Sequence, residues 1–187
     1  MFWFYILVFW IFLALLEIEI EWENGWAKHL PTWRKNRKDS SLWFLRSITG
    51  YHTILFLMIL FLNHIIYIGF FGWNGIVDEM MIIAFHLFLI IYWDFLWFVL
   101  NPHFTYKKFK QEHIPWYTDS EWIAGFPVDY WYAGWLAGVL VGFSFLINGN
   151  TPIIEQSLFT AWVGWVIWIS LIFASPLYHA WYKFMRQ

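Results

Sequence analysis

Five long runs of apolar residues divide the chain, and shorter polar segments separate them. The runs cover residues 2–20, 47–71, 76–100, 128–147 and 157–182. Each is close to the ~20 residues that an α-helix needs to cross the ~30 Å hydrocarbon core of a bilayer. The pattern predicts an all-α integral membrane protein, a bundle of five transmembrane helices that forms one domain over residues 1–187.

Proline and glycine positions predict the shape and packing of two of these helices. Pro176 lies inside the fifth run. Because proline lacks a backbone N–H, we expect the helix to bend there and the carbonyl of Ile172 to need another partner. In the fourth run Gly134, Gly138 and Gly142 recur every four residues, which places them on one face where another helix can approach closely.

The positions of the basic residues predict the orientation of the bundle. All 11 Lys and Arg residues fall in the first connector, the third connector and the C-terminal tail. They are Lys28, Arg34, Lys35, Arg37, Lys38 and Arg46, then Lys107, Lys108 and Lys110, then Lys183 and Arg186. Because positive charge marks the cytoplasmic side, we expect the N-terminus outside, the C-terminus in the cytoplasm and a multi-pass protein of the cytoplasmic membrane.

The composition supports a membrane setting and excludes several classes of function. Only 13% of the residues are charged and 61% are hydrophobic, which is far from the composition of a soluble domain. There is no basic region before the first run and no small-x-small cleavage site after it, so we expect it to be retained as a span. The chain has no Cys, which excludes disulfides, thiolate nucleophiles and Cys-bound metal clusters. The basic segments are expected to contact membrane lipid, and nothing indicates a nucleic-acid partner.

Polar residues recur along one side of the third run. At about 100° per residue, Glu79, His86, Asp94 and Asn101 fall within roughly 80° of one another on a helix. Ionisable groups inside a membrane usually face the protein interior or water. We therefore expect this stripe to face the other helices, either as a structural hydrogen-bond network or as part of a functional site.

Polar residues at matching depths suggest a site in the cytoplasmic leaflet. His52, Asp94 and His179 are the expected ligands of a divalent metal, with Zn, Fe or Mn as the ions that suit imidazole and carboxylate groups. Asp94, with Glu17 and Asn101 in support, would carry catalysis or proton transfer. The leading hypothesis is a small membrane enzyme that acts on a lipid-like or isoprenoid substrate.

Two other functions remain open at the level of sequence. His64 and His86 also lie at matching depth, so the chain is alternatively a haem- or quinone-binding electron-transfer subunit in which these histidines hold the cofactor. The third alternative is a non-catalytic structural subunit of an oligomer or larger membrane complex. Whether the chain is an enzyme is not decided by its sequence.

Four glutamates alternate at the end of the first run, namely Glu17, Glu19, Glu21 and Glu23. On a helix Glu17 and Glu21 share one face, while Glu19 points nearly opposite. We expect this run to be a solvated helix end that neutralises the basic connector beside it.

In length, number of spans and tryptophan content, with 17 Trp residues, the chain resembles the architecture of the tryptophan-rich sensory protein (translocator protein) family. That family has a Pro-rich and Trp-rich stretch between its first two spans. Here the first connector has only Leu30-Pro31-Thr32-Trp33-Arg34 in that place. The resemblance therefore implies neither a ligand site nor a detailed fold for this chain.

Overall fold

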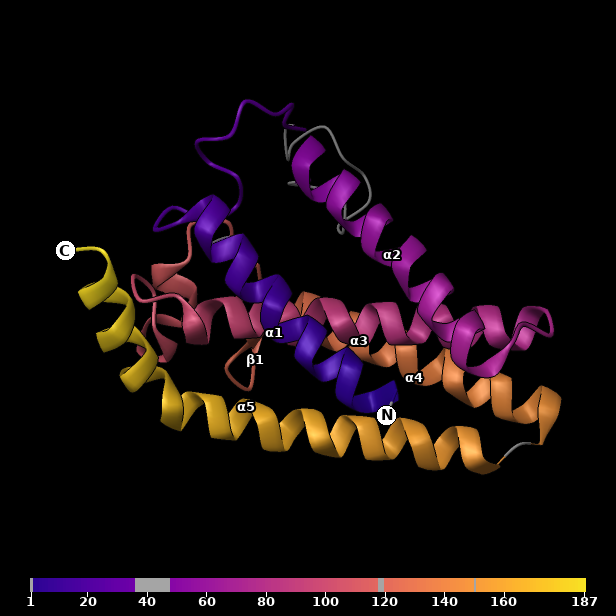
Figure 1. Ribbon diagram of the computed structural model, residues 1–187. Helices are drawn as coiled ribbons and strands as arrows, with labels where there is room; N and C mark the ends of the chain where they lie inside the picture. Colours follow the sequence, from indigo (N-terminus) through magenta and orange to yellow (C-terminus); the bar gives the residue numbers. More distant parts are fainter. Residues whose placement is uncertain (1, 36–47, 118–119, 150) are drawn as a thin grey trace.

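The computed structural model describes residues 2–35, 48–117, 120–149 and 151–187, and this part of the chain is dominated by five α-helices (Figure 1). They are α1 (Phe2–Glu21), α2 (Gly50–Phe71), α3 (Ile76–Leu100), α4 (Val128–Asn148) and α5 (Thr151–Met185). Helices α2, α3 and α4 and the Ala161–Met185 part of α5 are long and apolar enough to cross a membrane. The predicted all-α architecture with several membrane-span-like helices is therefore confirmed.

The helix bounds lie within one residue of the hydrophobic runs except at the start of α2 and at both ends of α5. Helix α2 begins at Gly50 because Thr49 caps it with its side chain, while the expected start at residue 47 lies outside the described residues, as do Arg37, Lys38 and Arg46. Helix α5 begins at Thr151, six residues before the predicted start at 157. Its first turns include polar residues such as Glu155, so the helix extends beyond the apolar run from which it was predicted.

Helix α3 is the centre of the fold, because each of the other four helices packs against it. Its C-terminal half is almost fully enclosed. Phe95, Leu96, Phe98 and Val99 have at most 1% of their surface exposed. Four of the five helices thus surround a fifth, which removes α3 from lipid over most of its length.

The polar stripe expected on α3 does face its neighbours. His86 and Asn101 are buried, and Asp94 is half-buried. Glu79, near the start of the helix, has 36% of its side chain exposed. The prediction of an inward-facing stripe is confirmed for the three deeper residues.

The connector between α3 and α4 packs beneath the end of α3. It contains two 3₁₀ turns, Tyr106–Lys108 and Gln111–His113, and a short hairpin of β1 (Trp122–Ile123) and β2 (Phe126–Pro127). Ala124 and Gly125 at the hairpin turn have φ of +49° and +82°, as a two-residue turn of the mirror-image type requires. The sequence indicated contact of this basic segment with membrane lipid but did not indicate the hairpin.

Helix α5 bends near its C-terminal end, as Figure 1 shows. Pro176 lies in the helix, and the carbonyl of Ile172, which loses its usual partner, accepts a hydrogen bond from Ser175 Oγ at 3.0 Å. Beyond the bend, Arg186 Nη2 lies 2.8 Å from Glu19 Oε2 on α1, and its guanidinium lies 3.5 Å from the centre of the Trp22 ring. The end of α5 is thereby attached to the end of α1.

A close approach between α3 and α5 depends on Gly164. The ring of Tyr92 lies where a Cβ at Gly164 would be, and the Tyr92 hydroxyl donates to the carbonyl of Ala161 at 3.0 Å. In contrast, a Cβ at Gly138 on α4 would meet no described atom within 4 Å. Of the expected glycine stripe on α4, only Gly134 faces a neighbour, the side chain of Ile91 at 3.8 Å.

We predict that Gly164→Ala destabilises the bundle by about 1–3 kcal/mol, because the new methyl group forces the Tyr92 ring out of its place. Thermal unfolding in detergent measures this loss. Gly138→Ala is the matched control and should be neutral or slightly stabilising, since its methyl group enters open space and alanine favours a helix. Equal effects of the two substitutions would contradict the packing described.

Candidate functional site

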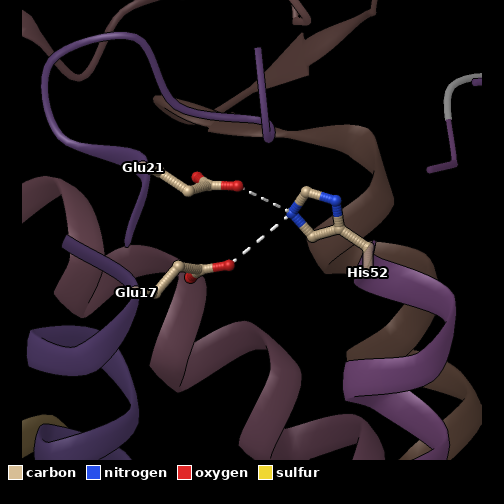
Figure 2. Close-up of side chains that lie close together, drawn as sticks. All are labelled: Glu17, Glu21 and His52. Atoms are coloured by element: carbon tan, nitrogen blue, oxygen red, sulfur yellow. Dashed lines mark ion pairs between the residues drawn. The ribbon is translucent and has the colours of Figure 1, made fainter. Parts of the chain in front are cut away.

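Two glutamates of α1 and one histidine of α2 meet in a buried cluster, the Glu17–Glu21–His52 triad (Figure 2). Both carboxylates point toward the same ring nitrogen. His52 Nε2 lies 3.6 Å from Glu17 Oε1 and 3.3 Å from Glu21 Oε1. The exposed fractions are only 7% for each glutamate and 3% for His52. One ligand atom from each residue lies within 4.8 Å of the others, which is close enough for the three to share one ion.

The sequence explains why the carboxylates reach the same place. Glu17 and Glu21 are four residues apart on α1, so they lie one above the other on one face. Glu19, on the opposite face, pairs instead with Arg186. The glutamates thus differ in environment, and only part of the acidic run is the solvated helix end that was expected.

His52 is positioned by the first turn of α2. Thr49 Oγ1 accepts the backbone N–H of His52 at 3.2 Å, which caps the helix, and lies 2.7 Å from His52 Nδ1. If Nδ1 carries the proton and donates it to this hydroxyl, the lone pair of Nε2 faces the two carboxylates. This tautomer is the one that a metal-binding histidine adopts.

The connector that follows α1 covers the triad. The backbone N–H of Ala27 donates to Glu21 Oε1 at 2.5 Å, and the Trp26 ring stacks on His52 at 4.2 Å between centroids. Trp22, Trp26 and Ala27 all have left-handed backbones, with φ of +55°, +48° and +53°. Such a conformation costs about 1–2 kcal/mol for a residue other than glycine, so tertiary contacts must stabilise it. Trp26 and Ala27 have these contacts with the triad, whereas Trp22 has them with Asn101 and Arg186.

Asp94 lies beside the triad as part of a second polar group. It is within electrostatic range of Glu17, Glu21 and His52. Its Oδ2 accepts hydrogen bonds from Tyr117 at 3.2 Å and from Tyr130. Burial, together with the nearby charge of Asp94, raises the pKa of Tyr117 well above its usual value, so the phenol keeps its proton and acts as the donor. Asp94 is thus held by two tyrosines from the connector and from α4.

Asn101 follows the last residue of α3, and the side chain of His179, on α5, reaches the same place. Asn101 Nδ2 donates to the carbonyl of Trp22 at 2.8 Å, and Oδ1 accepts the N–H of His103 at 3.0 Å. His179 Nε2 lies 3.1 Å from both carbonyl oxygens of Val99 and Leu100 and so caps the end of α3. Among the described residues, no ion pair joins His179 to Asp94 or Glu17.

His64 and His86 belong to a separate cluster between α2 and α3. His64 Nδ1 lies 2.7 Å from the carbonyl oxygen of Leu60, and Nε2 lies 3.1 Å from Glu79 Oε1. His86 Nδ1 lies 3.3 Å from Asn63 Nδ2. Both nitrogens of His64 therefore contact protein acceptors in this arrangement. Binding of haem by His64 and His86 stays a prediction from the sequence.

Of the site residues predicted from the sequence, the structure brings Glu17 and His52 into contact and places Asp94 nearby. Glu21, Thr49 and Trp26 were not assigned to the site. The four-residue spacing of Glu17 and Glu21 was a usable signal for the second carboxylate, whereas the contacts of Trp26 and Ala27 arise from a loop conformation that the residue types do not favour.

Comparisons of the chain with models of known protein families, with curated proteins and with solved structures find no match. The chemistry of the site therefore rests on its own residues. Two carboxylate oxygens and one imidazole nitrogen form a set of donors that suits a divalent ion.

We predict that Thr49→Val lowers the free energy of unfolding by about 1–2 kcal/mol, because it removes both the cap of α2 and the partner of His52 Nδ1. Denaturation followed by circular dichroism in detergent measures the change. Thr53→Val is the control, since the Thr53 hydroxyl only adds a bond to a helix carbonyl, at 2.9 Å from Thr49 O. Its effect should stay within about 0.5 kcal/mol, and a similar loss in both variants would argue against the cap.

Proposed function

We propose that this chain is a membrane metalloprotein that binds one divalent cation between Glu17, Glu21 and His52 and uses it on a lipid-like substrate. The observation that carries the proposal is the burial of two carboxylates around one imidazole nitrogen. Among the described residues, no Lys or Arg forms an ion pair with Glu17 or Glu21. Buried charges of one sign are strongly unfavourable without a counter-charge.

A divalent cation supplies that counter-charge, since two ionised carboxylates and one neutral imidazole sum to −2. Oxygen-rich ligand sets with one imidazole suit Mn²⁺, Fe²⁺ or Zn²⁺. Three protein ligands leave further coordination positions for water or substrate, and a metal in such a site acts as a Lewis acid and lowers the pKa of bound water. Protonation of a glutamate, or of His52 to an imidazolium that pairs with both carboxylates, is the competing way to reduce the charge.

The surroundings of the triad favour an apolar substrate. The rings of Trp26, Tyr51 and Phe56 lie 4.2, 5.0 and 6.0 Å from the His52 ring, measured between centroids. His52 itself lies at the start of a membrane-span-like helix. In this proposal Asp94, which accepts hydrogen bonds from Tyr117 and Tyr130, is the nearby group that exchanges protons with the substrate.

The finer topology belongs to the same proposal. We place five spans in the cytoplasmic membrane with the N-terminus outside, so that every Lys and Arg lies on the cytoplasmic side. The triad then lies in the cytoplasmic leaflet, because His52 is in the first turn of α2 and Glu21 is at the end of α1.

We predict that the purified wild-type protein binds about one Mn²⁺ per chain. Glu17→Gln, Glu21→Gln and His52→Gln should each weaken Mn²⁺ binding at least ~100-fold, because loss of a direct ligand exceeds the 10–100-fold effect of losing a supporting group. The amplitude of the free Mn²⁺ signal in electron paramagnetic resonance gives the affinity. Glu23→Gln is the control, since Glu23 is exposed and its nearest ion pair is with His103 at 3.8 Å. A wild-type protein that binds no better than the three ligand variants would refute the metal site.

The absence of Cys permits a direct test of orientation. We predict that Trp73→Cys, in the exposed turn between α2 and α3, reacts with a membrane-impermeant maleimide on intact cells. Lys108→Cys and Gln187→Cys should react only after the membrane is opened. The reverse pattern, or labelling of all three on intact cells, would rule out the proposed topology.

A further inference from the structure

The two halves of the triad come from helices that barely touch each other. Glu17 and Glu21 are on α1 and His52 is on α2, yet each of these helices packs mainly against α3 (Figure 1). Contact between α1 and α2 therefore does not set the distance between the carboxylates and the imidazole. The connector of residues 22–35 contacts both halves directly, through Ala27 at Glu21 and through Trp26 at His52.

The end of this connector is fixed to the start of α2. Arg34 forms an antiparallel bridge with Thr49, the residue that caps α2 and contacts His52 Nδ1. On either side of this bridge, the N–H of Gly50 donates to the carbonyl of Trp33 at 2.9 Å, and the N–H of Lys35 donates to the carbonyl of Ile48 at 3.2 Å. The backbone of Arg34 thus belongs to the imidazole half of the site.

The side chain of Arg34 reaches the other half. Its Nη1 donates to the carbonyl of Trp26 at 3.1 Å, and its Nη2 donates to the carbonyl of Ala27. The same two residues contact the triad, since the Ala27 N–H donates to Glu21 and the Trp26 ring stacks on His52. The Ala27 residue therefore connects the guanidinium of Arg34 to the carboxylate of Glu21 through one residue of backbone.

We propose that Arg34 is a positioning residue of the metal site, one that ties the carboxylate half to the imidazole half and holds them at the separation that binds the cation. This inference rests on the proposed function. Arg34 is exposed, so its contribution is geometric and does not consist of neutralising the buried carboxylates. The planar guanidinium can donate to two adjacent carbonyl groups at once, which the single ammonium of lysine does less well.

The backbone of the connector explains why a tie is needed. Trp26 and Ala27 both have positive φ, a conformation that residues with a side chain rarely adopt without outside contacts. Hydrogen bonds from Arg34 to both carbonyls select this conformation. Without them, we expect the segment to relax, and the Ala27 N–H and the Trp26 ring to leave Glu21 and His52.

The test is the affinity for Mn²⁺ of the full-length protein in detergent, measured by electron paramagnetic resonance. Arg34→Ala should bind Mn²⁺ about 10–100-fold more weakly than the wild type, the usual effect of losing a group that supports metal ligands. The Mn²⁺ affinity of Arg34→Lys should lie between those of the wild type and Arg34→Ala. Lys35→Ala is the matched control, since it removes a neighbouring exposed positive charge and leaves the backbone bond to Ile48 in place.

Chemical rescue separates positioning from a general loss of folding. Added methylguanidinium should restore part of the Mn²⁺ affinity of Arg34→Ala, whereas methylammonium at the same concentration should not. Unchanged affinity in Arg34→Ala, an equal loss in Lys35→Ala, or equal rescue by the two cations would each overturn the inference. In those cases the loss of binding in Glu17→Gln would still support the metal site itself. A wild-type protein that binds no Mn²⁺ would overturn both.

Discussion

The packing of four helices around α3 is the constraint on which the rest of the structure depends. A helix in lipid satisfies its own backbone, but its polar side chains need partners from neighbouring helices. Because α3 is enclosed by α1, α2, α4 and α5, its polar residues can find such partners at every level. His86 meets Asn63, Asp94 meets two tyrosines, and Asn101 meets the backbone beyond α1. Where α3 meets α5, the absence of a side chain at Gly164 leaves room for the ring of Tyr92.

The buried triad is built differently from the helix core. Its three residues come from two helices that are joined by a connector and by their common contact with α3. The helices deliver Glu17, Glu21 and His52 to the same end of the molecule, and the connector contacts both the carboxylates and the imidazole. Apolar packing therefore decides where the site lies, while hydrogen bonds to backbone carbonyls and amides decide its geometry.

Much of the fold could be predicted because each helix has a nearly continuous apolar sequence. The predicted range 76–100 agrees with α3, and the end at Phe71 and the start at Val128 also agree. The carbonyl that loses its helical hydrogen bond to Pro176 was correctly predicted to be that of Ile172, because proline removes the bond to the residue four positions before it. The start of α5 was missed because the predicted range followed apolar character, which does not mark a helix that extends past its apolar part.

The candidate site was predicted only in part, for reasons that are also physical. Depth along the spans brought Glu17 and His52 into one predicted site, and the structure places these two in contact, but depth does not reveal which direction a side chain faces across the bundle. His179 has a similar depth and instead caps α3 through the carbonyl oxygens of Val99 and Leu100. The connector was beyond sequence reasoning, since Trp22, Trp26 and Ala27 adopt a backbone conformation that tertiary contacts impose.

The ion pair between Arg186 and Glu19 joins two segments that are 167 residues apart in the chain. Synthesis proceeds from the N-terminus, so α1 emerges from the ribosome long before its partner on α5 exists. The end of α1 that bears Glu19 therefore gains this contact only when nearly the whole chain has been translated. The buried cluster itself needs none of these late residues, because its members and the groups that hold them lie between residues 17 and 52, so the joining of the two chain ends follows the synthesis of every part of the cluster.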